Sequence, residues 1–574
     1  MKNWFRNIVF LNLLFAGNIL LSQDIEEVVK APWVTANGGL TMSHIGNLST
    51  DSSFSQQPYS FYLSGNLNTQ FFDVIDMPVS FSYTNNEIDG SLPQPFNRFS
   101  MSPSYKWIKT YMGYTSMNFS PYTLSGHEFL GGGVELTPEK KIKFSAMYGR
   151  LNKAVEPDTL GTQPYYKRMG GGFKADYYHE KFDFSVNIFK AEDIKNSLTT
   201  NRDDSLFVKP KDNISGSAMM RFRIYSNLTI MAEYALSFMN QDIAMADSID
   251  GKSNIVFDNR GDISQYDAYK TSIRQSLEIG TIGATYERVS PNYTTLGAYY
   301  FNNDFENITA DFSTNIIPKV NLAMNVGYQR DDLNNQETTN SKRLIYSVNS
   351  NISASKKLSV TGSVSNVQTY IHIRDIYEQI TQTNQYQNLD TLSFTQLNFT
   401  SFANINYVLQ SNKQTNQNLN AGITYQQASE VQSDDSRFIG NQIYNGMLSY
   451  QYTLIPIKFN ISSTVNYNYN KMPEMDMKVL SINLSTRKTF IEKINASLAT
   501  TYSNSADTIN IINIRLAGGY IWLERHNFNL SLSMVNNING VYNTIQYGVN
   551  FTYSYMFNCN LKRENKEFKF EGDF

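Results

Sequence analysis

Long segments in which apolar and polar residues alternate recur from Val34 to Phe557, and they constrain the fold more than any other feature. In Ile457–Tyr469 almost every second residue is Ile, Phe, Val or Tyr, and the residues between are mostly polar. Phe182–Ile188 and Val320–Tyr328 show the same alternation. Because successive side chains of a strand point to opposite faces, each segment predicts a strand with one apolar and one polar face.

The predicted strands are too long for an ordinary globular sheet. Many span about nine to fifteen residues, whereas globular strands average about five or six and a tilted crossing of a bilayer takes about 9–11. Rings such as those of Tyr467 and Tyr469 end the apolar face, as at a membrane interface. The polar face carries small uncharged residues. We therefore predict an all-β fold, a single large transmembrane antiparallel up-and-down β-barrel.

Connection lengths indicate the strand number and the orientation of the barrel. Short links alternate with longer polar ones, as short periplasmic turns alternate with long extracellular loops. The alternation closes only if Tyr269–Ser290 is one strand; it then predicts about 26 strands, within a range of 22–28, and places both termini in the periplasm. The predicted long loops are 152–166, 194–211, 240–268, 329–341, 368–391, 428–437 and 536–541.

The N-terminus has the pattern of an export signal. Lys2 and Arg6 precede an apolar stretch from Ile8 to Leu21, which ends at a small, polar boundary. This predicts a signal peptide at 1–22, a short periplasmic segment at 23–33 and the barrel at 34–557, located in the cell outer membrane.

The last predicted strand is the clearest. Apolar residues from Ile545 to Phe557 form one unbroken stripe, similar to the aromatic-ended terminal strand of bacterial outer-membrane proteins. A charged tail, 558–574, follows. We interpret it as a disordered periplasmic end, the alternative being a docking segment.

Composition excludes several classes of function. The formal net charge is −3, so nucleic-acid binding has no electrostatic basis. Beyond the signal peptide, no run of 18 apolar residues predicts a spanning helix. The single cysteine, Cys559, cannot form an intramolecular disulfide. The five histidines lack metal-ligand spacing, and no catalytic arrangement stands out, so we expect no enzyme, no metal and no cofactor.

Two glycine runs predict a packing patch. If they lie at similar height on neighbouring strands, a loop or a partner could approach the bare backbone closely; local sheet bending is the alternative. The patch comprises Gly131, Gly132, Gly133, Gly149, Gly170, Gly171 and Gly172.

Several charged residues point inward by parity. They could set an ion preference, or they could pair with one another within a polar lumen. They are Lys143, Lys174, Asp176, Arg221, Arg223, Lys458 and Arg487.

A barrel of this size needs something to narrow it. With strands about 4.8 Å apart and tilted about 40°, some 26 strands give a radius on the order of 26 Å. Only about ten residues separate the predicted signal peptide from the first strand, which leaves no room for an N-terminal plug domain. We expect the 240–268 and 368–391 loops to narrow the lumen.

The Asn-rich strands, a signal peptide ending in Ser-Gln, and segments such as Ser102–Trp107 and Ala146–Leu151 resemble large plugless outer-membrane barrels of the Bacteroidota. Some barrels of that lineage are translocon or assembly components. The resemblance thus favours a structural or interaction component of an export or surface-assembly system, contacting outer-membrane lipid and a protein partner in the lumen or at the periplasmic rim. The alternative is a porin-like diffusion channel for small solutes.

Overall fold

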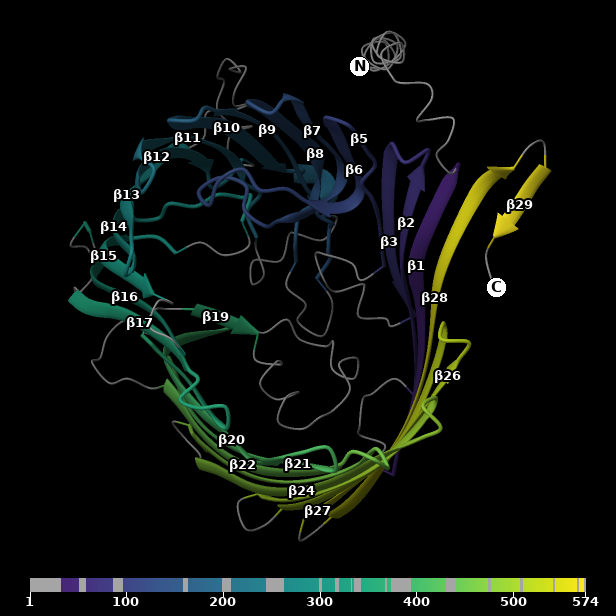
Figure 1. The fold of residues 1–574 in the computed structure, drawn as a ribbon. Helices are drawn as coiled ribbons and strands as arrows, with labels where there is room; N and C mark the ends of the chain where they lie inside the picture. Colours follow the sequence, from purple (N-terminus) through teal and green to yellow (C-terminus); the bar gives the residue numbers. More distant parts are fainter. Residues whose placement is uncertain are drawn as a thin grey trace.

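The chain forms a closed antiparallel β-barrel, shown as a ring of strands in Figure 1. The computed structural model describes residues 33–50, 58–85, 97–157, 164–198, 208–243, 263–298, 302–314, 319–331, 333–334, 342–366, 369–372, 394–429, 440–472, 476–505, 509–539, 542–564 and 567–571. These residues form 26 barrel strands, as predicted. No helix within them is long and apolar enough to span a membrane.

The strands follow one another around the ring in chain order. They are β1 (Val34–Ser49), β2 (Tyr59–Phe71), β3 (Ile75–Thr84), β4 (Arg98–Met101), β5 (Ser104–Tyr105), β6 (Ile108–Ser116), β7 (Glu128–Glu139), β8 (Ile142–Asn152), β9 (Arg168–Tyr178), β10 (Phe182–Asp193), β11 (Asp212–Tyr225), β12 (Leu228–Asn240), β13 (Ile263–Leu277), β14 (Gly280–Val289), β15 (Phe305–Thr314), β16 (Val320–Asp331), β17 (Lys342–Ile352), β18 (Leu358–Ser365), β19 (Thr369–His372), β20 (Phe394–Ser411), β21 (Thr415–Ser429), β22 (Gly440–Leu454), β23 (Phe459–Lys471), β24 (Asp476–Phe490), β25 (Ile494–Ser505), β26 (Ile509–Trp522), β27 (His526–Asn539), β28 (Tyr542–Glu564) and β29 (Glu567–Glu571).

Three of these segments do not add barrel strands. β4 and β5 both pair with β3 and β6 and act as one interrupted strand. β18 and β19 both pair with β20. β29 folds back on the end of β28 and lies outside the ring in Figure 1.

The first and last barrel strands close the sheet. β1 pairs with β28 from Val34 opposite Leu561 to Ser49 opposite Gln546. Hydroxyl groups join the two strands on the inner face, with Ser43 Oγ 3.1 Å from Thr552 Oγ1. The closure leaves neither strand with an open edge along this stretch.

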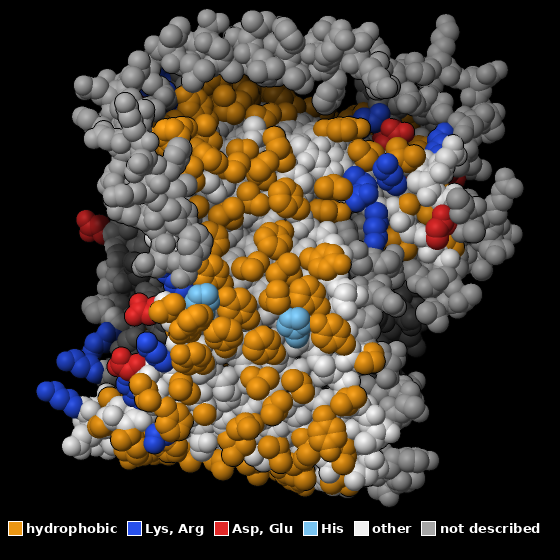
Figure 2. All heavy atoms as spheres, turned by 90° about the vertical axis from the view of Figure 1, so that its right-hand side faces the viewer, with side chains coloured by type: hydrophobic (Ala, Val, Ile, Leu, Met, Phe, Trp, Pro, Cys, Tyr) orange, Lys and Arg blue, Asp and Glu red, His pale blue; other side chains and the backbone are white. Residues whose placement is uncertain are grey.

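The alternation in sequence becomes two different faces of the barrel. On β24, the outward-pointing Ile482 and Leu484 are 45% and 50% exposed, although both are large and apolar. Between them, inward-pointing Asn483 donates a hydrogen bond to Thr501 Oγ1 on β25. Figure 2 shows that apolar side chains dominate one outer face of the barrel.

The prediction that Tyr269–Ser290 forms one strand is wrong. The segment is a hairpin in which Glu278 and Ile279 separate β13 from β14. Gly280 adopts φ +140°, a conformation that side chains rarely permit, and this allows the tight turn. Apolar Ile279 continues the alternation through the turn and conceals it in the sequence. An additional connection, 290–304, follows β14.

The predicted alternation of loop lengths fails towards the C-terminus. The connections after β23, β25 and β27 are only 472–475, 506–508 and 540–541, so most of the predicted 536–541 loop belongs to β27. β28 continues past residue 557 to Glu564 before turning into β29. The predicted signal peptide and nearly all of the 23–33 segment lie outside the described residues.

The register of the closing pair can be tested with a disulfide. In a Cys559→Ser background, Ser43→Cys with Thr552→Cys should form a bond across the directly opposed pair, because opposed residues of a sheet lie within disulfide reach. We expect a mobility shift on non-reducing gels that reductant abolishes. Ser43→Cys with Gly548→Cys, four residues out of register on the same face, is the control and should remain reduced.

Candidate functional site

Residues 117–127, between β6 and β7, fold into the barrel and dock on its inner wall. Thr123 Oγ1 donates a 2.7 Å hydrogen bond to Asn187 Oδ1 on β10. The neighbouring residues Val186 and Ile188 are exposed on the outer face, so Asn187 points inward. Further around the ring, Tyr122 OH donates 2.6 Å to Glu287 Oε1 on β14. The segment thus spans several strands of the inner wall; we call it the first docked loop.

A second inward-folded segment lies beside the first. Residues 290–298, after β14, form the second docked loop. Leu124 and Gly297 form a parallel bridge, in which Ser125 N donates 3.0 Å to Gly297 O. Tyr293 OH also donates to Tyr122 O at 2.8 Å. The two loops therefore act as one folded layer inside the sheet.

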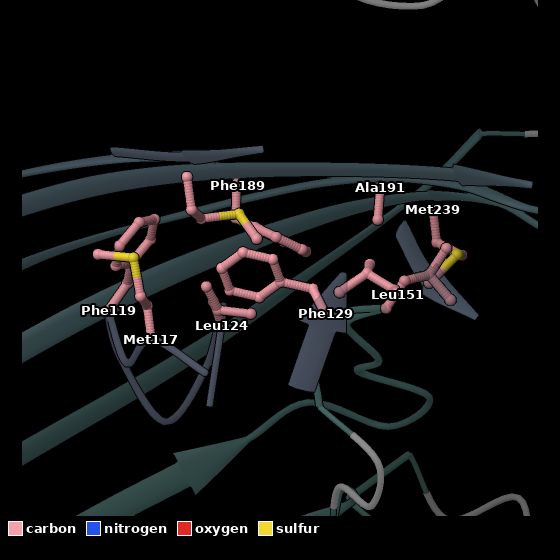
Figure 3. Close-up of a cluster of buried hydrophobic side chains, with 10 residues drawn as sticks. Met117, Phe119, Leu124, Phe129, Leu151, Phe189, Ala191 and Met239 are labelled. Atoms are coloured by element: carbon pink, nitrogen blue, oxygen red, sulfur yellow. The ribbon is translucent and has the colours of Figure 1, made fainter. Parts of the chain in front are cut away.

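An apolar core fills the space between this layer and the wall. In Figure 3 the side chains of the loop and of the strands converge beneath the sheet. Leu124, Phe189 and Met239 are fully buried. The loop therefore packs against the wall as closely as side chains pack in the interior of a soluble domain. The core comprises Met117, Phe119, Leu124, Phe129, Met147, Leu151, Phe189, Ala191, Met239 and Leu296.

Buried hydrogen bonds fix the register of the first docked loop. Asn187 Nδ2 donates to Ser217 Oγ at 2.7 Å, and Ser217 Oγ donates to Glu233 Oε1 at 3.0 Å. Ser120 Oγ also donates to Glu233. Burial, reinforced by nearby Glu287, raises the pKa of Tyr122 far above its ordinary value, so its hydroxyl remains a donor. An unmade bond here would leave a costly buried polar group.

The second docked loop is fixed through its backbone. Asn213 Oδ1 accepts from Leu296 N at 3.1 Å, while Asn213 Nδ2 donates to Ser237 Oγ at 2.8 Å. Ser237 Oγ in turn donates to Thr294 O at 2.6 Å. Two wall side chains thus supply partners for backbone groups of the loop, which would otherwise be buried without any.

The inward-facing glycines of the patch lie on the wall covered by the first docked loop. Gly113, Gly131, Gly149 and Gly170 are consecutive partners across β6, β7, β8 and β9 and form a row across the sheet. One step along the strands, a Cβ on Gly133 would lie 2.6 Å from Met117 Sδ. A Cβ on Gly172 would lie 2.7 Å from Phe119 Cε2. The space that side chains would occupy is taken by the loop.

Gly132 and Gly171 have the opposite orientation. The nearest atom to a Cβ on Gly132 would be Tyr111 O at 3.6 Å. A Cβ on Gly171 would meet the ring of Tyr148, which is 65% exposed on the outer face. These two glycines belong to the same runs, but they do not contact the loop.

Most of the predicted lumen charges form ion pairs with one another or with neighbouring residues on the inner face of β7–β11. Lys143 Nζ lies 3.0 Å from Glu135 Oε1, and Lys174 Nζ lies 3.5 Å from Asp176 Oδ1. Asp183 accepts from two arginines, Arg221 at 3.3 Å and Arg223 at 2.5 Å.

The two remaining charges differ from this group. Lys458 lies in the turn between β22 and β23, where it has φ +49°, and pairs with Glu492 of the adjacent turn at 3.0 Å. The parity argument failed for Lys458 because alternation holds only within a strand. Arg487 is on β24 and has the inward parity of Asn483.

Sequence reasoning missed both docked loops. The loops it favoured, 240–268 and 368–391, have their middle parts, 244–262 and 373–391, outside the described residues. The available signal was the apolar content of Met117–Leu124 in a connection expected to be polar. In the described part of the chain, no group of three or more His, Cys, Asp or Glu residues could hold a metal.

Comparisons with known proteins reveal similarity of shape only. No protein-family model and no curated protein matches the chain. Among solved structures, a ferric enterobactin receptor mutant from Pseudomonas aeruginosa is 9% identical with a TM-score of 0.41, covering 92% of this chain and 81% of that one. The P pilus usher translocation pore is 9% identical with a TM-score of 0.36, covering 91% and 99%. Likenesses this distant carry no inference about cargo.

Overpacking at an inward glycine should release the first docked loop. Gly133→Leu places a branched side chain where Met117 lies, and overpacking of this kind costs about 1–3 kcal/mol. We expect faster amide hydrogen exchange in residues 117–127. Gly132→Leu, one residue away on the outer face, is the matched control. Equal protection in both variants would show that the loop does not depend on the bare backbone.

Docking of the first loop should weaken in acid. Burial lowers the pKa of His127 to about 4, and its Nδ1–H donates to Glu128 O at 2.7 Å. The undocked ring has a pKa of about 6.5, so only the undocked state binds a proton between these values. Docking free energy is therefore full above about pH 6.5 and falls by about 3 kcal/mol as the pH approaches 4.

A spin label at Ser125→Cys in the Cys559→Ser background would report this change as increased loop mobility. His127→Gln cannot take up a proton and should flatten the profile. His179→Gln, in the turn between β9 and β10, should leave the profile intact. A profile that persists in His127→Gln would assign the effect to another group.

Proposed function

We propose that the chain is an integral β-barrel of the cell outer membrane, exported by its N-terminal signal peptide. The support is the outer face, where large apolar side chains are exposed on every strand from β23 to β28. Examples are Val465, Leu484, Leu498, Leu516, Leu530 and Phe551, all between 36% and 52% exposed. In water such a surface would be a severe aggregation liability, whereas lipid is its natural solvent.

Within that membrane, the proposed role is a structural or interaction component of an export or surface-assembly system. The inner wall of β18–β28 carries this proposal. Among its described side chains, the charged residues of inward parity are Arg487 and Arg515. The remainder of the surface consists largely of Ser, Thr and Asn. Because this wall has few fixed charges, a polar chain could slide along it or be held by it.

Cross-strand hydrogen bonds keep this wall ordered. Its side chains bond to one another across neighbouring strands and so form a continuous polar lining. The pairs are Asn404–Asn420 at 3.0 Å, Ser449–Thr464 at 2.9 Å, Ser462–Ser485 at 2.7 Å, Ser481–Ser503 at 2.8 Å and Asn483–Thr501 at 2.7 Å.

The docked loops give the barrel two unlike inner surfaces. They lie on β7–β14, across the ring from β20–β27 in Figure 1. The same wall carries the ion-paired charges of β7–β11. A partner or cargo would therefore meet a folded surface on one side and a lining of mostly Ser, Thr and Asn on the other.

A porin-like diffusion channel is the second candidate. It is favoured by the docked loops themselves, because inward-folded loops narrow a wide barrel without a separate domain. Its charge preference would come from the arginines of inward parity on the wall of β18–β28, Arg487 and Arg515.

Site-specific photo-crosslinking in native membranes tests the first candidate. A crosslinking residue at Asn483, on the lumen side, should capture the same protein partner as one at Thr501. Leu484 is the matched control, because it is the next residue and points to the opposite face. Absence of any adduct specific to the lumen positions would contradict a role in holding a partner.

Planar-bilayer recording distinguishes the diffusion channel from the interaction component. A stable, anion-preferring conductance from the purified barrel, reduced in selectivity by Arg487→Gln with Arg515→Gln, would support the diffusion channel. Silent or irregular recordings would leave the interaction component as the better account.

A further inference from the structure

A row of polar side chains crosses the outer face of β12–β16, close to where these strands meet their longer connections. Register places Tyr234 opposite Tyr269, Tyr269 opposite Arg288, Arg288 opposite Glu306, and Glu306 opposite Arg330. These residues share the parity of exposed apolar side chains, so the row lies on the outside of the barrel. We call it the arginine row.

The arginine row marks one edge of the apolar band. The next row along the same strands contains Ile308 and Tyr328, which are 59% and 45% exposed. Further rows contain Ile282 and Val326, 48% and 40% exposed. In the proposed outer membrane, the change from apolar rows to arginines falls at the boundary between acyl chains and headgroups.

The side chains of the row are already organised around one carboxylate. Arg330 Nη2 lies 2.8 Å from Glu306 Oε2, and Tyr286 OH donates 2.5 Å to Glu306 Oε1. Tyr269 OH lies 3.3 Å from Tyr286 OH and is also hydrogen bonded to Arg288. Bonds of this kind hold both guanidinium groups in place at the surface.

Donors exceed acceptors in the row. Two guanidinium groups supply ten N–H bonds and two positive charges, whereas Glu306 supplies one carboxylate. Within the described part of the structure, Arg288 Nε and Arg330 Nε are buried atoms without a hydrogen-bond partner, whereas the Arg330 side chain as a whole is 42% exposed. The row therefore has a net positive charge, and planar guanidinium groups match phosphate oxygens in pairs.

We infer that the arginine row is a binding site for the phosphate-bearing headgroup of an outer-leaflet lipid. The lipid's acyl chains would lie along the apolar rows beside it, and its phosphate oxygens would accept from Arg288 and Arg330. Position selects a lipid over a free anion, because the row borders the apolar band and not the lumen. The inference rests on the proposed outer-membrane location.

Binding to the detergent-purified, full-length barrel tests the site. The probes are diphosphorylated lipid A, the same lipid without phosphates, and inorganic phosphate. We expect the diphosphorylated lipid to bind best. Arg288→Gln with Arg330→Gln should weaken it by roughly tenfold for each arginine, the value of one charge-assisted hydrogen bond.

Two further variants test whether a loss of binding in the double variant is specific to the arginine row and not a result of misfolding. Arg274→Gln alters an arginine on β13 that faces the lumen and pairs with Asp311 at 3.6 Å, so lipid binding should not change. Glu306→Gln removes the carboxylate that pairs with Arg330, so binding should tighten severalfold.

Equal binding of the lipids with and without phosphate would overturn the inference, as would unchanged binding in the double variant. Competition by inorganic phosphate at the lipid's own concentration would show a simple anion site and overturn it as well. Because the assay uses micelles, its outcome is independent of membrane fractionation, which tests the outer-membrane location separately.

Discussion

Closure of the sheet is the constraint on which the rest of the structure depends. In an environment without water, every backbone N–H and C=O of a strand needs a partner, and only a sheet that meets its own edge provides one for all of them. Here the pairing of β1 with β28 joins segments more than 500 residues apart in sequence. Until that pairing forms, β1 and β28 both present an open edge.

Closure also creates an interior that must be lined. The barrel does so in two ways. On one side, small hydroxyl and amide side chains bond to one another across strands, as Ser462 does with Ser485. On the other side, two chain segments fold inward and bury a core against the wall. Gly133 and Gly172 make the second solution possible, because they lack the side chains that would hold Met117 and Phe119 away from the sheet.

Charged side chains are also distributed unequally between the two sides of the inner wall. The wall beneath and beside the docked loops carries paired charges such as Lys143 with Glu135, and it also supplies Glu233 and Glu287 as acceptors for the loop. Part-buried carboxylates are favourable only when donors reach them, and the loop adds Ser120 and Tyr122 to the donors that Ser217 and Lys270 supply from the wall. The wall of β18–β28, which consists largely of Ser, Thr and Asn, requires no such cover.

The sequence alone determined the strands, their two faces and an approximate strand number, because alternation is a local property that every strand repeats. It also singled out the glycines, since runs such as Gly170–Gly172 are conspicuous within strands. It could not distinguish Gly133 from Gly132 in their roles, nor place Lys458 in a turn, because inside and outside depend on where each strand begins.

Only the tertiary structure decided which connections fold inward. Thr123 meets Asn187, and Tyr122 meets Glu287, through contacts between residues 64 and 165 positions apart. No local pattern encodes a partner at such separation. The same holds for the arginine row, whose tyrosine, arginine and glutamate members lie side by side only through the register of β12–β16.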